Sequence, residues 1–469
     1  MKLNDENLRI KTLLFILVVL LKFPVLNLPH NWDSAAFAEH TMIIYRNNMM
    51  PLTLNEIDII HPPAIFEIVA FLYMIFGESP MISHSVILVF SFFGVYFTYL
   101  LGSYLYNRNI GVTSALLLFF FPLYFAQSAT LNLDIPMTAL EIMTVYYLVR
   151  KNTILYTLSG SLLVLTKEPG ILIIFAIFLY LLIYERPASK FIKSLLTYGL
   201  PFIVFFLFIL YQKITSGYFL SEFHVSYFQI SLQKFLFLIF STLGLFFICL
   251  SLWEVLLLFF KSKKPEIMIW KNELTLLIII VFIYGNFLSM AYMPRYALPL
   301  LPIIAIFFSI IVSVIFDKLR YIILVGILFL FIANWYGYDC KVGSCEVNME
   351  YVDVINVHRD ATRYIESNFQ NSIVLTTWPL SVELNNPELH YVKTSIRSID
   401  FRCVPDFNIN DPTLSKCKPQ PDLKDADIIL YSPHGAMRKE FFELVKRYNA
   451  TLIREFHSDG KYAAVYRIR

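Results

Sequence analysis

A few acidic and basic side chains stand in short polar segments between the long apolar runs of this chain. Two are aspartates and three are or can become cationic: Asp33, Asp134, Lys167, Arg295 and His61. A carboxylate can accept the proton of an attacking hydroxyl, and Lys, Arg or His⁺ can hold an anionic leaving group as its charge develops. Phosphate is the natural leaving group for such a set. The residue types therefore favour a group-transfer reaction in which a phosphate departs.

Each of these residues also has a structural interpretation. Asp33 and Asp134 could cap the helices that follow them. His61 precedes Pro62-Pro63 and could belong only to a stiff turn. Lys167 and Arg295 could be snorkelling side chains at helix ends. The sequence leaves these readings open beside the catalytic one.

Two further carboxylates, Glu39 and Glu168, are candidate supporting residues that a solvated or structural role explains better. Nothing in the chain requires a metal or another cofactor. A divalent cation would fit Asp33 and Asp134 only if Glu39 converged with them.

Composition excludes an ordinary soluble protein. Of 469 residues, 57% are hydrophobic, 17% aromatic and 16% charged, against roughly 25% charged in soluble domains. A net charge of +3, from 38 Lys+Arg and 35 Asp+Glu, also argues against a disordered or nucleic-acid-binding chain. The apolar excess ends near residue 336. We expect a polytopic α-helical membrane domain over 1–336 and a soluble α/β domain over 337–469.

About eleven segments are long and apolar enough to be candidate spans. They cover 12–28, 82–105, 110–128, 135–149, 153–166, 170–184, 194–211, 235–260, 273–291, 297–316 and 320–336. The first follows a cationic N-terminus and could be a signal peptide. Lys22-Phe23-Pro24 offers no small-residue cleavage site, however, and this favours an uncleaved helix.

The Lys and Arg clusters orient the predicted spans. With a cytoplasmic N-terminus, every cationic cluster falls in an inner loop. The segment 64–76 is too short to span and becomes a juxtamembrane or re-entrant helix of a large outer loop, 29–81. The other outer segments are 129–134, 167–169, 212–234, 292–296 and everything after 336. All the candidate chemical residues then lie on the extracytoplasmic face of the cell membrane.

Cysteine usage agrees with an outer, oxidising location for the C-terminal domain. Four cysteines fall there: Cys340, Cys345, Cys403 and Cys417. Two disulfides are expected, most simply Cys340 with Cys345 and Cys403 with Cys417, although three pairings are possible. A zinc site built from all four cysteines is the alternative, which the lack of a CxxC pair disfavours.

The outer domain alternates helical and strand patterns. Helices are expected at 352–369 and 441–448, strands at 372–377 and 426–431, and a hairpin from 451–456 and 462–468. A small α/β domain with a mixed sheet would result. From its position, this domain covers the site or helps bind the acceptor.

Short strings in these segments carry a resemblance to a known family. They are Trp32-Asp33-Ser34, His61-Pro62-Pro63 before a short helix ended by Gly77, Leu133-Asp134-Ile135-Pro136, Leu165-Thr166-Lys167-Glu168-Pro169-Gly170 and Arg295-Tyr296-Ala297-Leu298-Pro299 with Pro302. Across 1–336 their order and common sidedness resemble the GT-C superfamily of membrane glycosyltransferases. The most similar group is that of the protein O-mannosyltransferases and lipid A aminoarabinose transferases.

This resemblance implies a polyprenyl-phosphate sugar donor and inversion at the anomeric carbon. It implies that Asp33 is the base or acceptor-orienting group, that Asp134 is a second acidic site residue, and that Lys167 and Arg295 lie near the donor phosphate. The aminoarabinose transferases have a lysine where this chain has His61, so phosphate binding there depends on protonation. The Trp-Trp-Asp-Tyr-Gly string of the oligosaccharyltransferases is absent.

The sequence thus predicts an inverting glycosyltransferase of the membrane that moves a sugar from a polyprenyl-phosphate donor to a protein, lipid or glycan acceptor on the outer face. The rival hypothesis is a polytopic transporter or flippase for a lipid-linked or anionic substrate. Transporters commonly show internal repeats and polar residues near the bilayer midplane. Here no repeat is evident and the candidate residues gather at one interface.

Overall fold

A computed structural model describes most of the chain. The described residues are 5–48, 61–184, 188–217, 219, 272–290, 293–315, 319–337, 340, 344–401, 425–434, 445–446 and 448–468. Cys403, Cys417, the predicted span 235–260 and most of the predicted helix 441–448 lie outside them.

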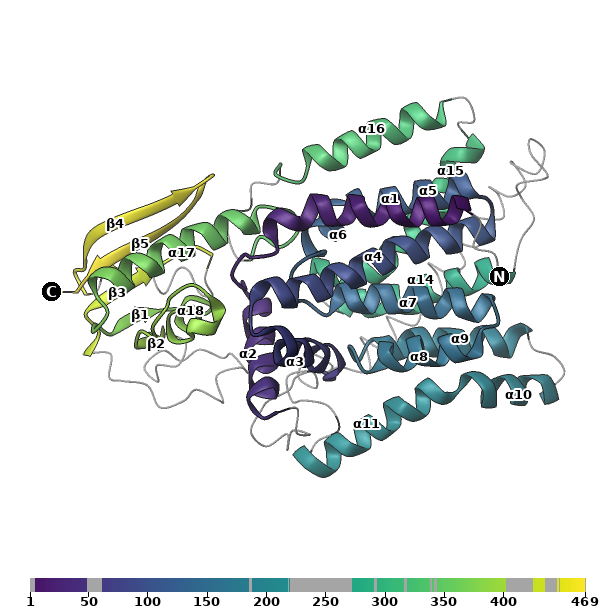
Figure 1. Cartoon of the computed structure of the whole chain (residues 1–469), viewed down its shortest axis with the longest axis horizontal. Coiled ribbons are helices and arrows are strands. Elements are labelled where there is room, and N and C mark those ends of the chain that lie inside the picture. The colour runs from purple at the N-terminus through teal and green to yellow at the C-terminus, as the bar shows by residue number, and fades with distance from the viewer. Residues whose placement is uncertain are drawn as a thin grey trace.

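Apolar helices run side by side and form the main body of the molecule (Figure 1). They are α1 (Asp5–Lys22), α4 (Pro80–Leu105), α5 (Arg108–Phe120), α6 (Pro122–Gln127), α7 (Asp134–Val149), α8 (Thr153–Val164), α9 (Gly170–Tyr184), α10 (Ala188–Tyr198), α11 (Leu200–Ser216), α14 (Asn272–Met290), α15 (Leu301–Ile315) and α16 (Arg320–Ala333). Two stretches are long and apolar enough to cross a bilayer by length and composition alone, Pro80–Leu105 and Pro294–Ser313. The other apolar helices among the described residues are shorter.

Proline and glycine divide several predicted spans. The predicted span 110–128 breaks between α5 and α6, because Pro122 has no N–H and forces Phe121 out of helical geometry, with ψ 125°. The predicted span 194–211 breaks at Gly199, which separates α10 from α11. The stretch predicted at 297–316 begins as a 3₁₀ helix, η2 (Pro294–Leu300).

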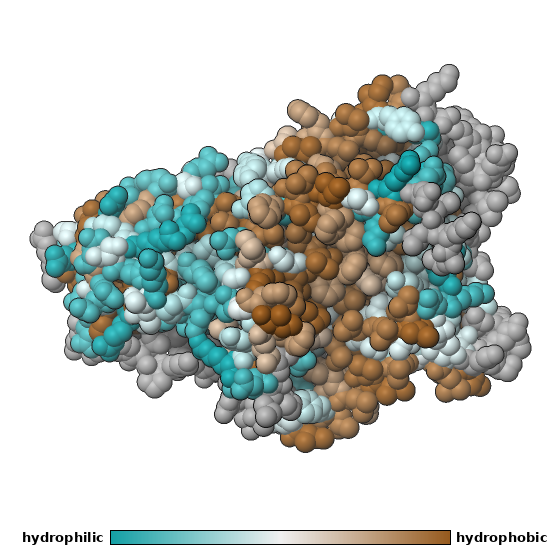
Figure 2. Space-filling view, viewed as in Figure 1, coloured by the Kyte–Doolittle hydropathy of each residue, from teal (hydrophilic) through white to brown (hydrophobic). Residues whose placement is uncertain are grey.

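The outer wall of the helical body is apolar. On α16, Ile322, Val325 and Phe329 are each between 67% and 70% exposed. Figure 2 shows hydrophobic residues over this body and hydrophilic residues over the C-terminal part. Soluble monomers rarely expose apolar surface on this scale. The wall therefore has the character of a surface that faces lipid.

Two helices lie at the end of the body that faces the C-terminal part (Figure 1). They are α2 (Asp33–Arg46) and α3 (Ala64–Phe76), which pack against each other. The second has the bounds predicted for the juxtamembrane helix, and Gly77 ends it with φ 83°. Its first residue, Ala64, donates a backbone hydrogen bond of 3.1 Å to the carbonyl of Leu165.

The C-terminal part is a mixed five-stranded sheet with helices. In the order β2-β1-β3-β5-β4, the strands are β2 (Ser398–Asp400), β1 (Val374–Thr376), β3 (Ile428–Tyr431), β5 (Lys461–Arg467) and β4 (Thr451–Ser458). The first three are parallel, and β5 is antiparallel to both neighbours. Its helices are α17 (Tyr351–Asn368), α18 (Leu380–Asn385) and the 3₁₀ helix η3 (Pro387–Leu389). Only β2 and the two short helices lack a counterpart in the sequence prediction for this region.

Polar and aromatic contacts hold the C-terminal part against α2 and the turn after α3. His390 Nε2 lies 2.8 Å from Glu78 Oε1. The rings of Trp32 and Trp378 meet edge to face, with centroids 4.7 Å apart. The C-terminal part therefore sits directly beside the first residues of α2.

Candidate active site

Arg295 lies at the centre of a buried cluster of charges, with its side chain 5% exposed. One terminal nitrogen, Nη2, contacts Asp33 Oδ2. The other, Nη1, donates to Glu346 Oε2 at 2.7 Å. Its Nε lies 3.3 Å from Asp134 Oδ2. One guanidinium therefore faces three carboxylates from three separate segments.

Lys167 extends this cluster. Its Nζ donates to Asp134 Oδ1 at 2.6 Å, and the two side chains are 6% and 2% exposed. The same Nζ lies 4.2 Å from the centroid of the Tyr296 ring. Asp134 thus joins both cations. The structure brings together four of the five predicted site residues, Asp33, Asp134, Lys167 and Arg295.

Neither aspartate serves as a helix cap. Each is the first residue of its helix, and the cap positions belong to Trp32 and Leu133 without any side-chain cap bond. The capping interpretation is therefore wrong for both. Trp32 has φ 52°, a left-handed conformation that is uncommon for a bulky residue. The backbone is thus strained immediately before Asp33.

Tight turns carry the two cations. Gly170 N donates to Lys167 O at 2.9 Å, and a Cβ at Gly170 would lie 2.7 Å from the carbonyl oxygen of Leu163. Arg295 follows Pro294 at the start of η2. Because both side chains are buried against Asp134, the snorkelling interpretation is wrong for both.

Comparison with known proteins finds a related family and similar folds. Residues 60–211 match the family model of the dolichyl-phosphate-mannose-protein mannosyltransferases. The structure of ArnT from Cupriavidus metallidurans bound to undecaprenyl phosphate is 11% identical, with 98% of both chains covered and a TM-score of 0.59. The same protein in the apo state is 12% identical, with the same coverage and TM-score. This chain has a GT-C fold.

At this level of identity the likeness to ArnT is one of fold. The archaeal oligosaccharyltransferase AglB from Archaeoglobus fulgidus is 12% identical, with 99% of this chain and 74% of that chain covered and a TM-score of 0.48. No curated protein sequence matches the chain. The resemblance to the GT-C superfamily that the sequence indicated is confirmed.

The remaining predicted residues of this GT-C protein lie around the cluster. His61 Nδ1 is 2.9 Å from Glu168 Oε2, so the segment before α3 is tied to the residue that follows Lys167. Glu39 accepts a hydrogen bond from Asn386 of the C-terminal part. The structure thus joins Glu39 to Asn386, while Asp33 contacts Arg295 and Asp134 contacts both cations. Glu39 therefore does not join Asp33 and Asp134 as the third carboxylate that a divalent cation would need.

Glu346 is the site residue that sequence reasoning missed. It lies between α16 and α17 with its side chain 13% exposed, and Gln127 Nε2 donates to its carbonyl oxygen at 2.9 Å. Burial raises the pKa of its carboxyl group to about 7, although Arg295 acts in the opposite direction. In the sequence, Glu346 is one charged residue in a polar segment. Its position directly after Cys345 is the only feature that distinguishes it.

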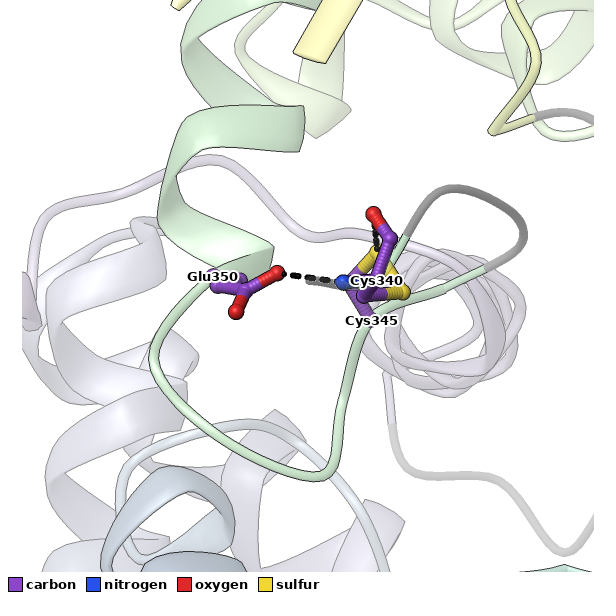
Figure 3. Close-up of side chains that lie close together, drawn as sticks. All are labelled: Cys340, Cys345 and Glu350. Carbon is purple, nitrogen blue, oxygen red and sulfur yellow. Dashed lines mark hydrogen bonds between the residues drawn. A yellow bond between two sulfur atoms is a disulfide. The ribbon is translucent and has the colours of Figure 1, made fainter. Parts of the chain in front are cut away.

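The neighbouring cysteines form a disulfide, Cys340–Cys345 (Figure 3). Glu350 lies beside this bond and accepts the backbone N–H of Cys340 at 2.9 Å. A disulfide leaves no thiolate for a metal, so the zinc alternative is wrong for this pair. The bridge closes a short loop directly before Glu346.

The cluster contains the elements of the predicted chemistry. Two buried cations lie within reach of one carboxylate, Asp134, and can hold the oxygens of a phosphate. Asp33 is the most exposed of the three carboxylates, at 26% for its side chain. It is therefore the carboxylate that a substrate reaches most easily.

Proposed function

We propose that this protein is an integral-membrane inverting glycosyltransferase that moves a sugar from a polyprenyl-phosphate donor to an acceptor. The observation that carries the proposal is the buried cluster in which Lys167 and Arg295 alternate with Asp33 and Asp134. The fold likeness to ArnT, which has been solved with bound undecaprenyl phosphate, supports a lipid phosphate as part of the substrate.

In the proposed reaction the acceptor hydroxyl attacks the anomeric carbon of the sugar. Asp33 accepts the hydroxyl proton as the new C–O bond forms. The bond from the anomeric carbon to the phosphate oxygen breaks on the opposite side, and its electron pair leaves with the lipid phosphate. Lys167 and Arg295 stabilise the charge that develops there. Attack opposite the leaving group inverts the anomeric configuration.

Asp134 has a positioning role in this scheme. Its two oxygens face different cations, Lys167 Nζ at 2.6 Å and Arg295 Nε at 3.3 Å. The carboxylate therefore fixes the spacing between the two groups that receive the phosphate. His61 acts on the phosphate only when it is protonated, and its Nδ1 lies 2.9 Å from Glu168 Oε2.

We further propose that residues 1–336 form the membrane domain, with the N-terminus in the cytoplasm and the site on the outer face. The apolar wall of the helical body supports membrane insertion (Figure 2). The Cys340–Cys345 disulfide supports an oxidising compartment for the domain 337–469. Arg108 pairs with Glu6 near the N-terminus, as expected for a loop on the cytoplasmic side.

The test is sugar transfer by purified, reconstituted protein. Labelled polyprenyl-phosphate sugars are supplied with and without candidate acceptors, and release of lipid phosphate is measured. Asp33→Asn should lower transfer by about 10³-fold, because a neutral amide cannot take the proton. Asp353→Asn is the matched control, since Asp353 accepts a hydrogen bond from Ser458 away from the cluster.

Two results would contradict the proposal. Full transfer by Asp33→Asn would remove Asp33 from the reaction. Movement of an intact lipid-phosphate sugar across the bilayer, without cleavage, would favour the flippase instead.

A further inference from the structure

Glu346 has no part in the proposed reaction, yet it makes a direct contact with the site. Its Oε2 accepts a 2.7 Å hydrogen bond from Arg295 Nη1. A guanidinium binds carboxylates and phosphates with the same fork of N–H donors. With Asp33 on Nη2 and Glu346 on Nη1, both terminal nitrogens of Arg295 are engaged by carboxylates. Each terminal nitrogen carries two N–H donors, so a donor phosphate that binds Arg295 must either lie against a carboxylate of like charge on the same nitrogen or displace it.

We propose that Glu346 is a further residue of the donor-phosphate site, one that holds Arg295 Nη1 in the donor-free protein and yields that nitrogen to a phosphate oxygen when the donor binds. This inference rests on the proposed function, because it assumes that Arg295 binds the donor phosphate. It adds one event to donor binding, in which a phosphate oxygen replaces the Glu346 carboxylate on Arg295.

Glu346 is better placed to leave than either aspartate. Asp134 is held by both cations and is the first residue of α7, within the packed helical body. Asp33 begins α2 and is the proposed base. Glu346 stands on an irregular segment between α16 and α17 and has the longer side chain. It can therefore move without shifting a helix.

A small cavity with room for about one water molecule lies next to Glu346, on the side toward which its carboxyl group can turn. Glu346 lines this cavity together with Asn31, Ser34, Thr130 and Tyr351. The side-chain amide of Asn31 is buried, and neither its nitrogen nor its oxygen has a hydrogen-bond partner among the residues that the structure describes. An unpaired buried amide is costly. A carboxylate that turned toward the cavity would accept a hydrogen bond from Asn31 Nδ2.

The charges that face Glu346 set the pH dependence of this exchange. They are Arg295, Asp33 and Tyr351, and His84 lines the same cavity. Burial places the pKa of Glu346 near 7, so below that pH the neutral acid is the main form. A neutral acid holds Arg295 less strongly than a carboxylate does. Phosphate should then bind more tightly as the pH falls through about 7.

The experiment measures binding of polyprenyl methyl phosphate to the full-length protein in detergent. This phosphodiester keeps one charge between about pH 5.5 and 8.5, unlike a phosphomonoester, whose second pKa is about 6. Glu346→Gln should bind it about tenfold more tightly at high pH, since one charged competitor is gone, and should lose the part of the pH dependence that Glu346 causes. Glu346→Ala should also bind more tightly.

Glu78→Gln is the matched control. It removes one negative charge from the same end of the helical body, where Glu78 pairs with His390 rather than with Arg295. Its affinity should equal that of the unchanged protein. Thermal unfolding of each variant identifies a loss of folding as the cause of any loss of binding.

Equal or weaker binding by folded Glu346→Gln would overturn the inference, and so would equal tightening by Glu78→Gln. Failure of the unchanged protein to bind the phosphodiester would overturn it as well. If Glu346→Gln binds more tightly but the unchanged protein transfers no sugar from any labelled donor, the ligand exchange stands and the proposed glycosyl transfer fails.

Discussion

Two buried carboxylates on one short segment, Glu346 and Glu350, have opposite surroundings. Glu350 accepts from Lys461 Nζ and from the backbone of Cys340, while Asn348 donates to its other oxygen at 3.2 Å. One cation and two neutral donors satisfy it. Glu346 instead shares Arg295 with two other carboxylates. A carboxylate with all its partners in place, Glu350, thus lies only four positions along the chain from Glu346, which competes with other carboxylates for its cation.

The difference separates a structural ion pair from a site. A buried network with every partner satisfied stabilises one arrangement. A cluster with more carboxylates than cations, a strained residue at Trp32 and an unpaired amide at Asn31 is held in place by the surrounding fold. Such a cluster can exchange one of its competing carboxylates for a ligand. Three predictions test whether this contrast holds.

Lys461→Met should produce the largest effect of the three changes. It should lower stability and leave the transfer activity of the folded protein unchanged. Lys461 is buried against Glu350, so its removal leaves an uncompensated buried charge. We expect a loss of about 3 kcal/mol in the free energy of unfolding. The transfer rate per folded molecule should not change, because Lys461 has no contact with Arg295 among those the structure describes. Chemical denaturation in parallel with the transfer assay measures both quantities. A large fall in turnover by the folded variant would contradict the contrast.

Arg295→Lys should have the converse effect. The substitution keeps the positive charge and hence much of the stability. The single ammonium nitrogen of lysine, however, cannot donate hydrogen bonds in the three coplanar directions that the guanidinium of arginine serves. We expect a loss of roughly a hundredfold in kcat/KM, or about 2.7 kcal/mol, for sugar transfer. Arg454→Lys on β4 is the control, because Arg454 lies over the Tyr364 ring away from the cluster. Steady-state kinetics with labelled donor measures the change, and equal losses in both variants would refute a specific role for Arg295.

The four clustered residues could be predicted because of their surroundings in the sequence. Asp33, Asp134, Lys167 and Arg295 stand beside long apolar runs, where charges are scarce and each one is conspicuous. Sorting them by membrane side placed them on one face. Their ion pairs were not predictable, since those depend on how segments between 33 and 262 residues apart pack together.

Glu346 could not be found in this way because it lies in a polar segment where charges are common. The fold shows the same limit. An apolar run of 13 residues, too short to span, predicted the helix at 64–76, while strand β2 has only three residues and leaves no pattern to detect. The break in the helix at Phe121 could have been predicted from Pro122. The long apolar run around this proline instead favoured one continuous span.

The smallest expected effect concerns the disulfide-closed loop directly before Glu346. Replacing Cys340 and Cys345 together by serine removes a bridge between residues five positions apart, and the chain-entropy model gives about 2 kcal/mol for a loop of this size. The backbone of Cys340 also donates to Glu350. The saturated carboxylate should therefore lose a donor, and the free energy of unfolding should fall. Glu346 should lose only the restraint on its position, so binding of polyprenyl methyl phosphate should tighten, by less than in Glu346→Gln. Weaker binding by the folded double variant would mean that the bridge shapes the phosphate site itself, and the two carboxylates would then not be independent.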